Sequence, residues 1–78
     1  KTKQMSTLTE SIIVDSSAIH NAVYQHVTRA LTLTYKSGLA YEYYNVPSHI
    51  FDRLRESRSK GKFINAHVLR RYNFKKIV

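Results

Sequence analysis

The stretch ALTLTY-KSG-LAYEYY, residues 30–44, decides the fold. Apolar and polar side chains alternate on both sides of Lys36-Ser37-Gly38, which is the pattern of two half-buried strands joined by a hairpin. Gly38 can supply the positive φ that such a short turn needs. The shared apolar faces carry Leu31, Leu33 and Tyr35 in the first strand and Leu39, Tyr41 and Tyr43 in the second.

A third strand is predicted upstream, over residues 19–27, which are rich in Ile, Val and Tyr. With the hairpin it makes a three-stranded antiparallel meander. Ile12-Ile13-Val14 is a short apolar segment that forms either an extra edge strand or a lid on the core. Residues 1–11 are mostly polar and aperiodic, and we expect them to form a flexible N-terminal arm.

The hydrophobic period changes from strand to helix after Val46. Pro47 suits the first turn of a helix, and Ile50, Phe51 and Leu54 then form an apolar stripe. A second helix is predicted over residues 63–71, separated from the first at Gly61. Tyr72-Asn73-Phe74 breaks the pattern and is expected to tuck back on the body. The predicted fold class is α+β, one domain over residues 12–78, with two helices packed on one face of the sheet.

The charge of the chain is high and unevenly placed. The 78 residues have a net charge of +8. Within residues 53–76 the only acid is Glu56, against Arg53, Arg55, Arg58, Lys60, Lys62, Arg70, Arg71, Lys75 and Lys76. Such a field attracts polyanions, although basic residues can also serve solubility alone. A chain this short buries only ~60% of its unfolded surface, so we expect a shallow binding surface rather than a deep catalytic cleft.

The absence of cysteines and of long apolar runs predicts the cellular compartment. There are no cysteines, which excludes disulfides and thiolate chemistry and favours a reducing compartment. No apolar run approaches the ~18 residues of a membrane span. We expect a soluble, cytoplasmic protein without a membrane partner.

Several short motifs together resemble the KTSC domain, a family named for its place at the C-terminus of some lysyl-tRNA synthetases and found alone in small bacterial and phage proteins. The motifs lie between residues 14 and 78. They are Val14-Asp15-Ser16-Ser17, Leu31-Thr32-Leu33-Thr34-Tyr35, Ser37-Gly38, Tyr41-Glu42-Tyr43, Val46-Pro47, Ser59-Lys60-Gly61-Lys62-Phe63, Asn65, Arg70 and Tyr72. One departure is Ile64, where the family often has Phe before the Asn. The family has no firmly assigned activity, and RNA binding is the role usually suggested for it.

The segment Ser59-Lys60-Gly61-Lys62 is the strongest candidate for an anion-binding site. If the second helix begins near Gly61, its free N–H groups and two lysines form a pocket for a phosphate or sulfate. The alternative is that Gly61 only stops the preceding helix and the lysines are solvated. Arg55 and Arg58 extend the basic surface, and the resemblance adds Arg70.

The tyrosines of the third predicted strand have two interpretations. Tyr41 and Tyr43 either stack on bases or pack in the core against the helices, and core packing is favoured. Tyr44, on the other face with Glu42, is then the better candidate for an exposed aromatic. Asn65 lies among apolar residues, so we expect a buried structural amide that holds the Ser16-Ser17 loop or the interhelix turn.

Catalytic and metal sites are not predicted. No pair among His20, His26, His49 and His67 has the i, i+4 spacing of a helical metal site. Asp15-Ser16-Ser17 is more typical of a turn than of part of a triad. We therefore expect no enzyme, metal or cofactor.

The sequence thus predicts a small nucleic-acid-binding module, RNA before DNA, that makes mainly phosphate contacts. The alternative is a protein-interaction adaptor, for example a small phage or bacterial protein that docks on an acidic partner. The structural roles are assigned to Gly38, Pro47 and Asn65.

Overall fold

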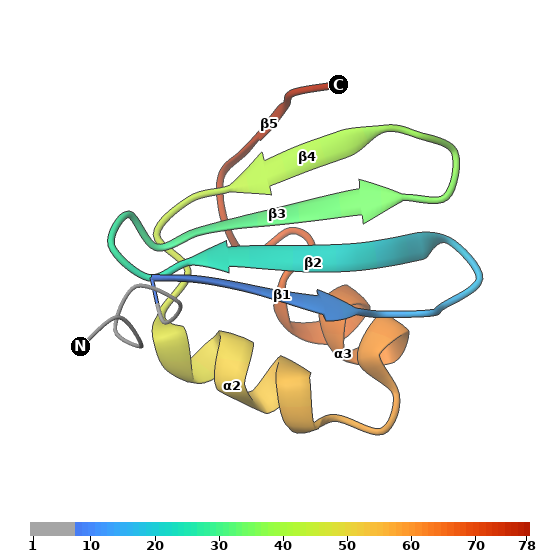
Figure 1. Ribbon diagram of the computed structural model, residues 1–78, viewed down its shortest axis with the longest axis horizontal. Helices are drawn as coiled ribbons and strands as arrows, with labels where there is room; N and C mark the ends of the chain where they lie inside the picture. Colours follow the sequence, from blue (N-terminus) through green and yellow to red (C-terminus); the bar gives the residue numbers. More distant parts are fainter. Residues whose placement is uncertain (1–7) are drawn as a thin grey trace.

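The computed structural model describes residues 8–78 and has the predicted α+β class (Figure 1). The sheet has five strands, not the three of the predicted meander. In chain order the elements are β1 (Thr9–Ile13), β2 (Ile19–Gln25), β3 (Ala30–Tyr35), β4 (Ala40–Tyr43), α2 (Ser48–Glu56), α3 (Lys60–His67) and β5 (Phe74–Lys76). Most of the predicted arm lies outside the described residues, and its residues 9–11 belong to β1.

The strands lie in the order β1-β2-β3-β4-β5, and each is antiparallel to its neighbours. Thr9 pairs with Gln25 and Ile13 with Asn21, so the N-terminal apolar segment is an edge strand and not a lid. The hairpin between β3 and β4 is as predicted, because Gly38 has a φ of 99°.

The strand β5 was not predicted. Instead of merely tucking back, Phe74 pairs with Tyr43 at the far edge of the sheet. The strand has only three residues, two of them lysines, which is too short for an alternating pattern to be recognised.

The first helix follows the prediction closely. Pro47 lies immediately before α2 with a φ of −63°, and Ile50, Phe51 and Leu54 are its buried residues. This stripe packs on the sheet face that carries Tyr24, whose ring stacks on that of Phe51 at 5.0 Å between centroids. Both helices lie on the same side of the sheet (Figure 1).

The second helix is displaced from its predicted range of residues 63–71. The Phe63 N–H donates to the Ser59 carbonyl at 2.9 Å, so helical bonding begins before Gly61, and Gly61 lies inside the first turn. The helix ends early, at His67, because the Leu69 N–H donates to the Ile64 carbonyl and not to that of Asn65. Arg70 follows with a φ of 69°, in the left-handed region that a helix cannot continue through. None of the helices within residues 8–78 is long and apolar enough to cross a membrane.

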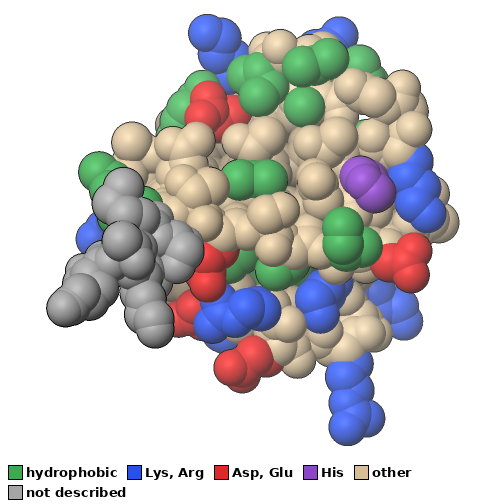
Figure 2. Space-filling model, viewed as in Figure 1, with side chains coloured by type: hydrophobic (Ala, Val, Ile, Leu, Met, Phe, Trp, Pro, Cys, Tyr) green, Lys and Arg blue, Asp and Glu red, His purple; other side chains and the backbone are tan. Residues whose placement is uncertain are grey.

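Figure 2 shows how charge is distributed over one side of the molecule. The surface over the strands is made largely of neutral side chains, and most lysines and arginines lie at its margins and over the helices. A polyanion therefore has little to bind on the central part of this side, and the candidate site is better sought where the sheet meets the helices.

Candidate functional site

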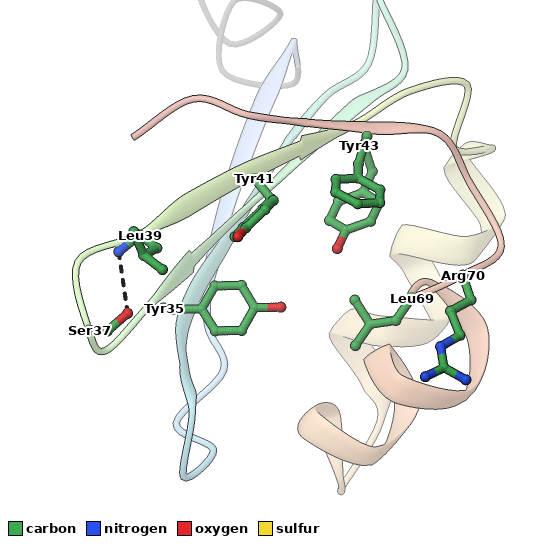
Figure 3. A pocket seen from close by; sticks show the side chains of 8 residues that line it. Tyr35, Ser37, Leu39, Tyr41, Tyr43, Leu69 and Arg70 are labelled. Atoms are coloured by element: carbon green, nitrogen blue, oxygen red, sulfur yellow. Dashed lines mark hydrogen bonds between the residues drawn. The ribbon is translucent and has the colours of Figure 1, made fainter.

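A groove lies between the sheet and the segment that follows α3. Its wide part has a volume of about 440 Å³. It is lined by Tyr35, Ser37, Leu39, Tyr41, Tyr43, Leu69, Arg70 and Phe74. Figure 3 shows the Tyr35 and Tyr43 hydroxyls directed toward Leu69, across the hollow from the strands. The groove exists because the helices leave part of the inner face of β3, β4 and β5 uncovered.

The groove continues toward the first turn of α3. This narrow part has a volume of about 230 Å³. It is lined by Ser16, Ser17, Ala18, Ile19, Tyr35, Gly61, Lys62, Asn65 and Leu69. Tyr35 and Leu69 line both parts, so the two hollows adjoin at these side chains. Among the described residues that line either part, none is acidic.

Aromatic rings form one wall of the wide part. The ring centroids of Tyr35 and Tyr41 are 5.8 Å apart, and those of Tyr41 and Phe74 are 5.7 Å apart. Tyr43 belongs to the core, whereas Tyr41 is only partly buried and Phe74 is 55% exposed. The core interpretation therefore holds for Tyr43, while Tyr41 also presents its ring to the groove.

The Tyr35 and Tyr43 hydroxyls of this wall are protonated at neutral pH. Burial raises the pKa of Tyr43 to about 12, with a further contribution from the neighbouring Tyr35. Burial also raises the pKa of Tyr35. Because buried Tyr43 is hydrogen-bonded to Tyr35, the Tyr35 phenol is the one that can donate to a ligand over the whole physiological range.

The two lysines of the predicted anion pocket have different surroundings. Lys60 donates from Nζ to the Ser57 carbonyl oxygen at 2.8 Å, and Ser57 is the C-cap of α2. Lys60 is therefore engaged in closing the end of that helix. Lys62 is exposed and lines the narrow part of the groove.

The arginines also divide between structure and surface. Arg55 donates to Glu10 at 3.2 Å and to Asp52 at 3.0 Å, so it ties α2 to β1. Arg58 is exposed, and exposed Arg70 lines the wide part of the groove. Within residues 8–78, Arg55 is the only lysine or arginine in an ion pair.

The alternative interpretation, in which Gly61 only stops the first helix, is wrong, because α2 already ends at Glu56 and Gly61 belongs to α3. A Cβ at residue 61 would lie 2.7 Å from the Ser16 Cβ. Ser16 in turn shapes the turn before β2, because its Oγ accepts the Ile19 N–H at 2.9 Å. Gly61 thus allows α3 to approach the Ser16-Ser17 loop, and Ser16, Ser17 and Gly61 all line the narrow part.

The surroundings of Tyr44 and Asn65 differ from those predicted. Tyr44 is half-buried and donates from its hydroxyl to the Glu42 carboxylate at 3.1 Å, so it is less free than predicted. Asn65 is exposed rather than buried, although it does line the narrow part beside Ser16 and Ser17.

Tyr35, Leu69 and Phe74 were not predicted as site residues from the sequence. Tyr35 was placed on the correct face of its strand, but nothing in the alternation marks the end of a strand as uncovered. Leu69 and Phe74 depend on where α3 ends and on the unpredicted strand β5. Among residues 8–78 no three His, Asp or Glu side chains gather as a metal site would require.

The fold and groove define a small α+β domain with a shallow, basic-rimmed surface site. The model of the KTSC domain matches residues 15–72, and the chain belongs to this family. A crystal structure of a KTSC domain protein from Yersinia pestis superposes with a TM-score of 0.80 at 25% identity, covering 90% of this chain and 99% of that chain.

The chain matches both a small protein and a much longer one. A protein of Tsukamurella paurometabola is 41% identical over 59 residues, which are 76% of this chain and 88% of that protein. A lysine–tRNA ligase of Nostoc punctiforme is 30% identical over 63 residues, which are 81% of this chain but 11% of the ligase. The chain therefore spans most of the length of the Tsukamurella paurometabola protein but only about a tenth of the length of the ligase.

Proposed function

We propose that this KTSC domain is a non-enzymatic nucleic-acid-binding module that prefers RNA to DNA. The observation that carries the proposal is a pair of adjoining hollows, the wide part lined by Arg70 and the narrow part by Lys62, with no acidic residue among the described lining of either. Two cations at adjoining hollows can contact successive phosphates of a single chain.

The wider charge distribution supports the same partner. The net charge is +8, and exposed Arg58 adds a cation on the loop before α3. Affinity that comes mainly from phosphates falls steeply with salt and shows little sequence preference. The preference for RNA is supported by the likeness to a lysine–tRNA ligase, whose name includes an RNA.

The test is fluorescence anisotropy of labelled single- and double-stranded RNA and DNA, at low and at physiological salt. We expect binding that persists at physiological salt and weakens on Lys62→Glu with Arg70→Glu. The matched control is Arg29→Glu with Lys75→Glu, which changes the net charge equally at two exposed positions outside the groove lining. Equal losses in the two double variants would contradict a groove site, and binding seen only at low salt would contradict the function.

A second candidate function is a protein-interaction adaptor. It is favoured by apolar side chains exposed at the end of the chain, where Phe74, Ile77 and Val78 are 55%, 45% and 66% exposed. An acidic protein surface would complement the same basic rim. A pull-down after nuclease treatment distinguishes the two, because it removes partners bridged by nucleic acid and retains a direct protein partner.

A further inference from the structure

The wide part of the groove has properties that phosphate binding alone does not require. Its volume of about 440 Å³ falls in the ~300–1,000 Å³ range of small-molecule pockets. Its wall is aromatic, and Leu69 faces that wall (Figure 3). Phosphate groups are bound by cations and N–H donors, so these apolar surfaces need a different part of the ligand to cover them.

The chemistry of the lining specifies what that part is. Phe74 is 55% exposed and Tyr41 is partly buried, and both offer π-faces on which a flat ring can stack. The Tyr35 hydroxyl can donate to a ring nitrogen or a carbonyl oxygen. Exposed Arg70, which also lines the wide part, can bind an adjoining anion. A nucleotide combines these features, because it joins a flat base to a phosphate.

We infer that the wide part of the groove receives one unstacked base of a single-stranded nucleic acid, with the adjoining phosphate at Arg70 and a further phosphate at Lys62. The inference rests on the proposed function and adds a strand preference to it. A paired base has its faces covered by its neighbours in the helix, so a duplex can offer phosphates to the rim but no free face to the wall. The domain therefore binds single strands more tightly than duplexes of equal charge.

The first arm of the test uses the unmodified protein. Two single-stranded RNA oligonucleotides of the same length are compared, one normal and one in which the central nucleotides are abasic. Base–aromatic stacking contributes ~1–3 kcal/mol per base, so we expect the abasic strand to bind about 5- to 150-fold more weakly. Equal affinity for the two strands would overturn the inference.

The second arm removes a ring face without removing charge. Phe74→Leu keeps an apolar side chain at an exposed position, and we expect it to weaken single-strand binding several-fold while duplex binding is unchanged. Tyr44→Leu is the matched control, because it removes an aromatic that does not line the groove. Unchanged single-strand binding by Phe74→Leu, or an equal loss in both variants, would overturn the inference.

Failure of nucleic-acid binding and failure of base recognition give different results in these experiments. If the protein binds no nucleic acid at physiological salt, the proposed function fails and the base site fails with it. If normal and abasic strands bind equally and both bind well, only the base site fails. If Phe74→Leu loses a direct protein partner in the nuclease-treated pull-down while strand binding is unchanged, the groove is a protein site and the inference is overturned.

Discussion

Gly61 in the first turn of α3 lies directly against Ser16 in the loop between β1 and β2. A Cβ at residue 61 would come within 2.7 Å of the Ser16 Cβ and 3.3 Å of its Oγ. The Ser16 Oγ accepts the Ile19 N–H and holds the start of β2. This contact therefore joins the helical layer to the sheet at the narrow part of the groove.

Gly61→Ala is expected to lower the free energy of unfolding by about 1–2 kcal/mol. Overpacking of this kind costs ~1–3 kcal/mol, and the better helix propensity of Ala offsets up to ~1 kcal/mol. Denaturant unfolding measures the change. The control is the same substitution in a Ser16→Gly background, where the obstructing Cβ is gone and Gly61→Ala should be neutral or stabilising. A stabilising effect in the unmodified protein would show that the contact does not constrain residue 61.

Lys60→Met and Lys62→Met should have different effects, although both lysines lie in the first turn of α3. We expect the first variant to lose stability and the second to lose nucleic-acid affinity. Lys60 caps Ser57 at 2.8 Å, so its loss should cost ~0.5–1 kcal/mol of stability. Lys62 lines the groove, so its loss should lower the slope of log K against log salt by about 1 and leave stability unchanged. Thermal unfolding and salt-dependent anisotropy measure the two effects. The assignment is wrong if the pattern is reversed.

Arg55→Gln is expected to affect stability and not nucleic-acid affinity. Its ion pairs with Glu10 and Asp52 are partly exposed, and such pairs contribute ~0.2–1 kcal/mol. A double-mutant cycle with Glu10→Gln should give a coupling of this size that decreases at high salt. Arg58→Gln is the comparison, since exposed Arg58 should contribute to binding instead. A larger affinity loss from Arg55→Gln than from Arg58→Gln would contradict this division.

Tyr43→Phe should make the protein less sensitive to alkaline pH. Burial raises the pKa of Tyr43 from 10.0 to about 12 in the folded state, so the protonated phenol favours folding. That contribution is complete below pH 10.0 and is lost as the pH rises to about 12, by an amount on the order of 2–3 kcal/mol. Denaturant unfolding across this interval should show a smaller decline in the Tyr43→Phe variant. Parallel declines in the two proteins would indicate that Tyr43 ionises normally.

The parts of the fold that depend on local pattern were predictable. The alternation of β3 and β4, the positive φ at Gly38 and the α2 stripe of Ile50, Phe51 and Leu54 are all confirmed. Strand β5 was not predictable, because three residues with two lysines carry no period, and they pair only through the tertiary placement of β4. The early end of α3 at His67 and the left-handed φ of Arg70 were not predictable either, because neither residue type favours such a conformation.

Residues that line the groove were predictable only where both the residue type and its position along a strand or helix suggested binding. Lys62, Arg70 and Tyr41 were named from the sequence and do line the groove. Lys60 was named with Lys62, but spacing alone cannot show that its ammonium group reaches back to a helix C-terminus. Phe74 was missed as a site residue because its exposure depends on the edge position of β5.

The most direct test of nucleic-acid binding in the groove is the affinity of the unmodified protein for a single-stranded RNA at physiological salt. The same strand with abasic central nucleotides, and the Lys62→Glu with Arg70→Glu variant, are measured beside it. Binding in the groove predicts clear affinity for the normal strand, weaker affinity for the abasic strand and a large loss in the charge-reversed protein. No binding at physiological salt, or binding that the charge reversal leaves unchanged, would contradict it.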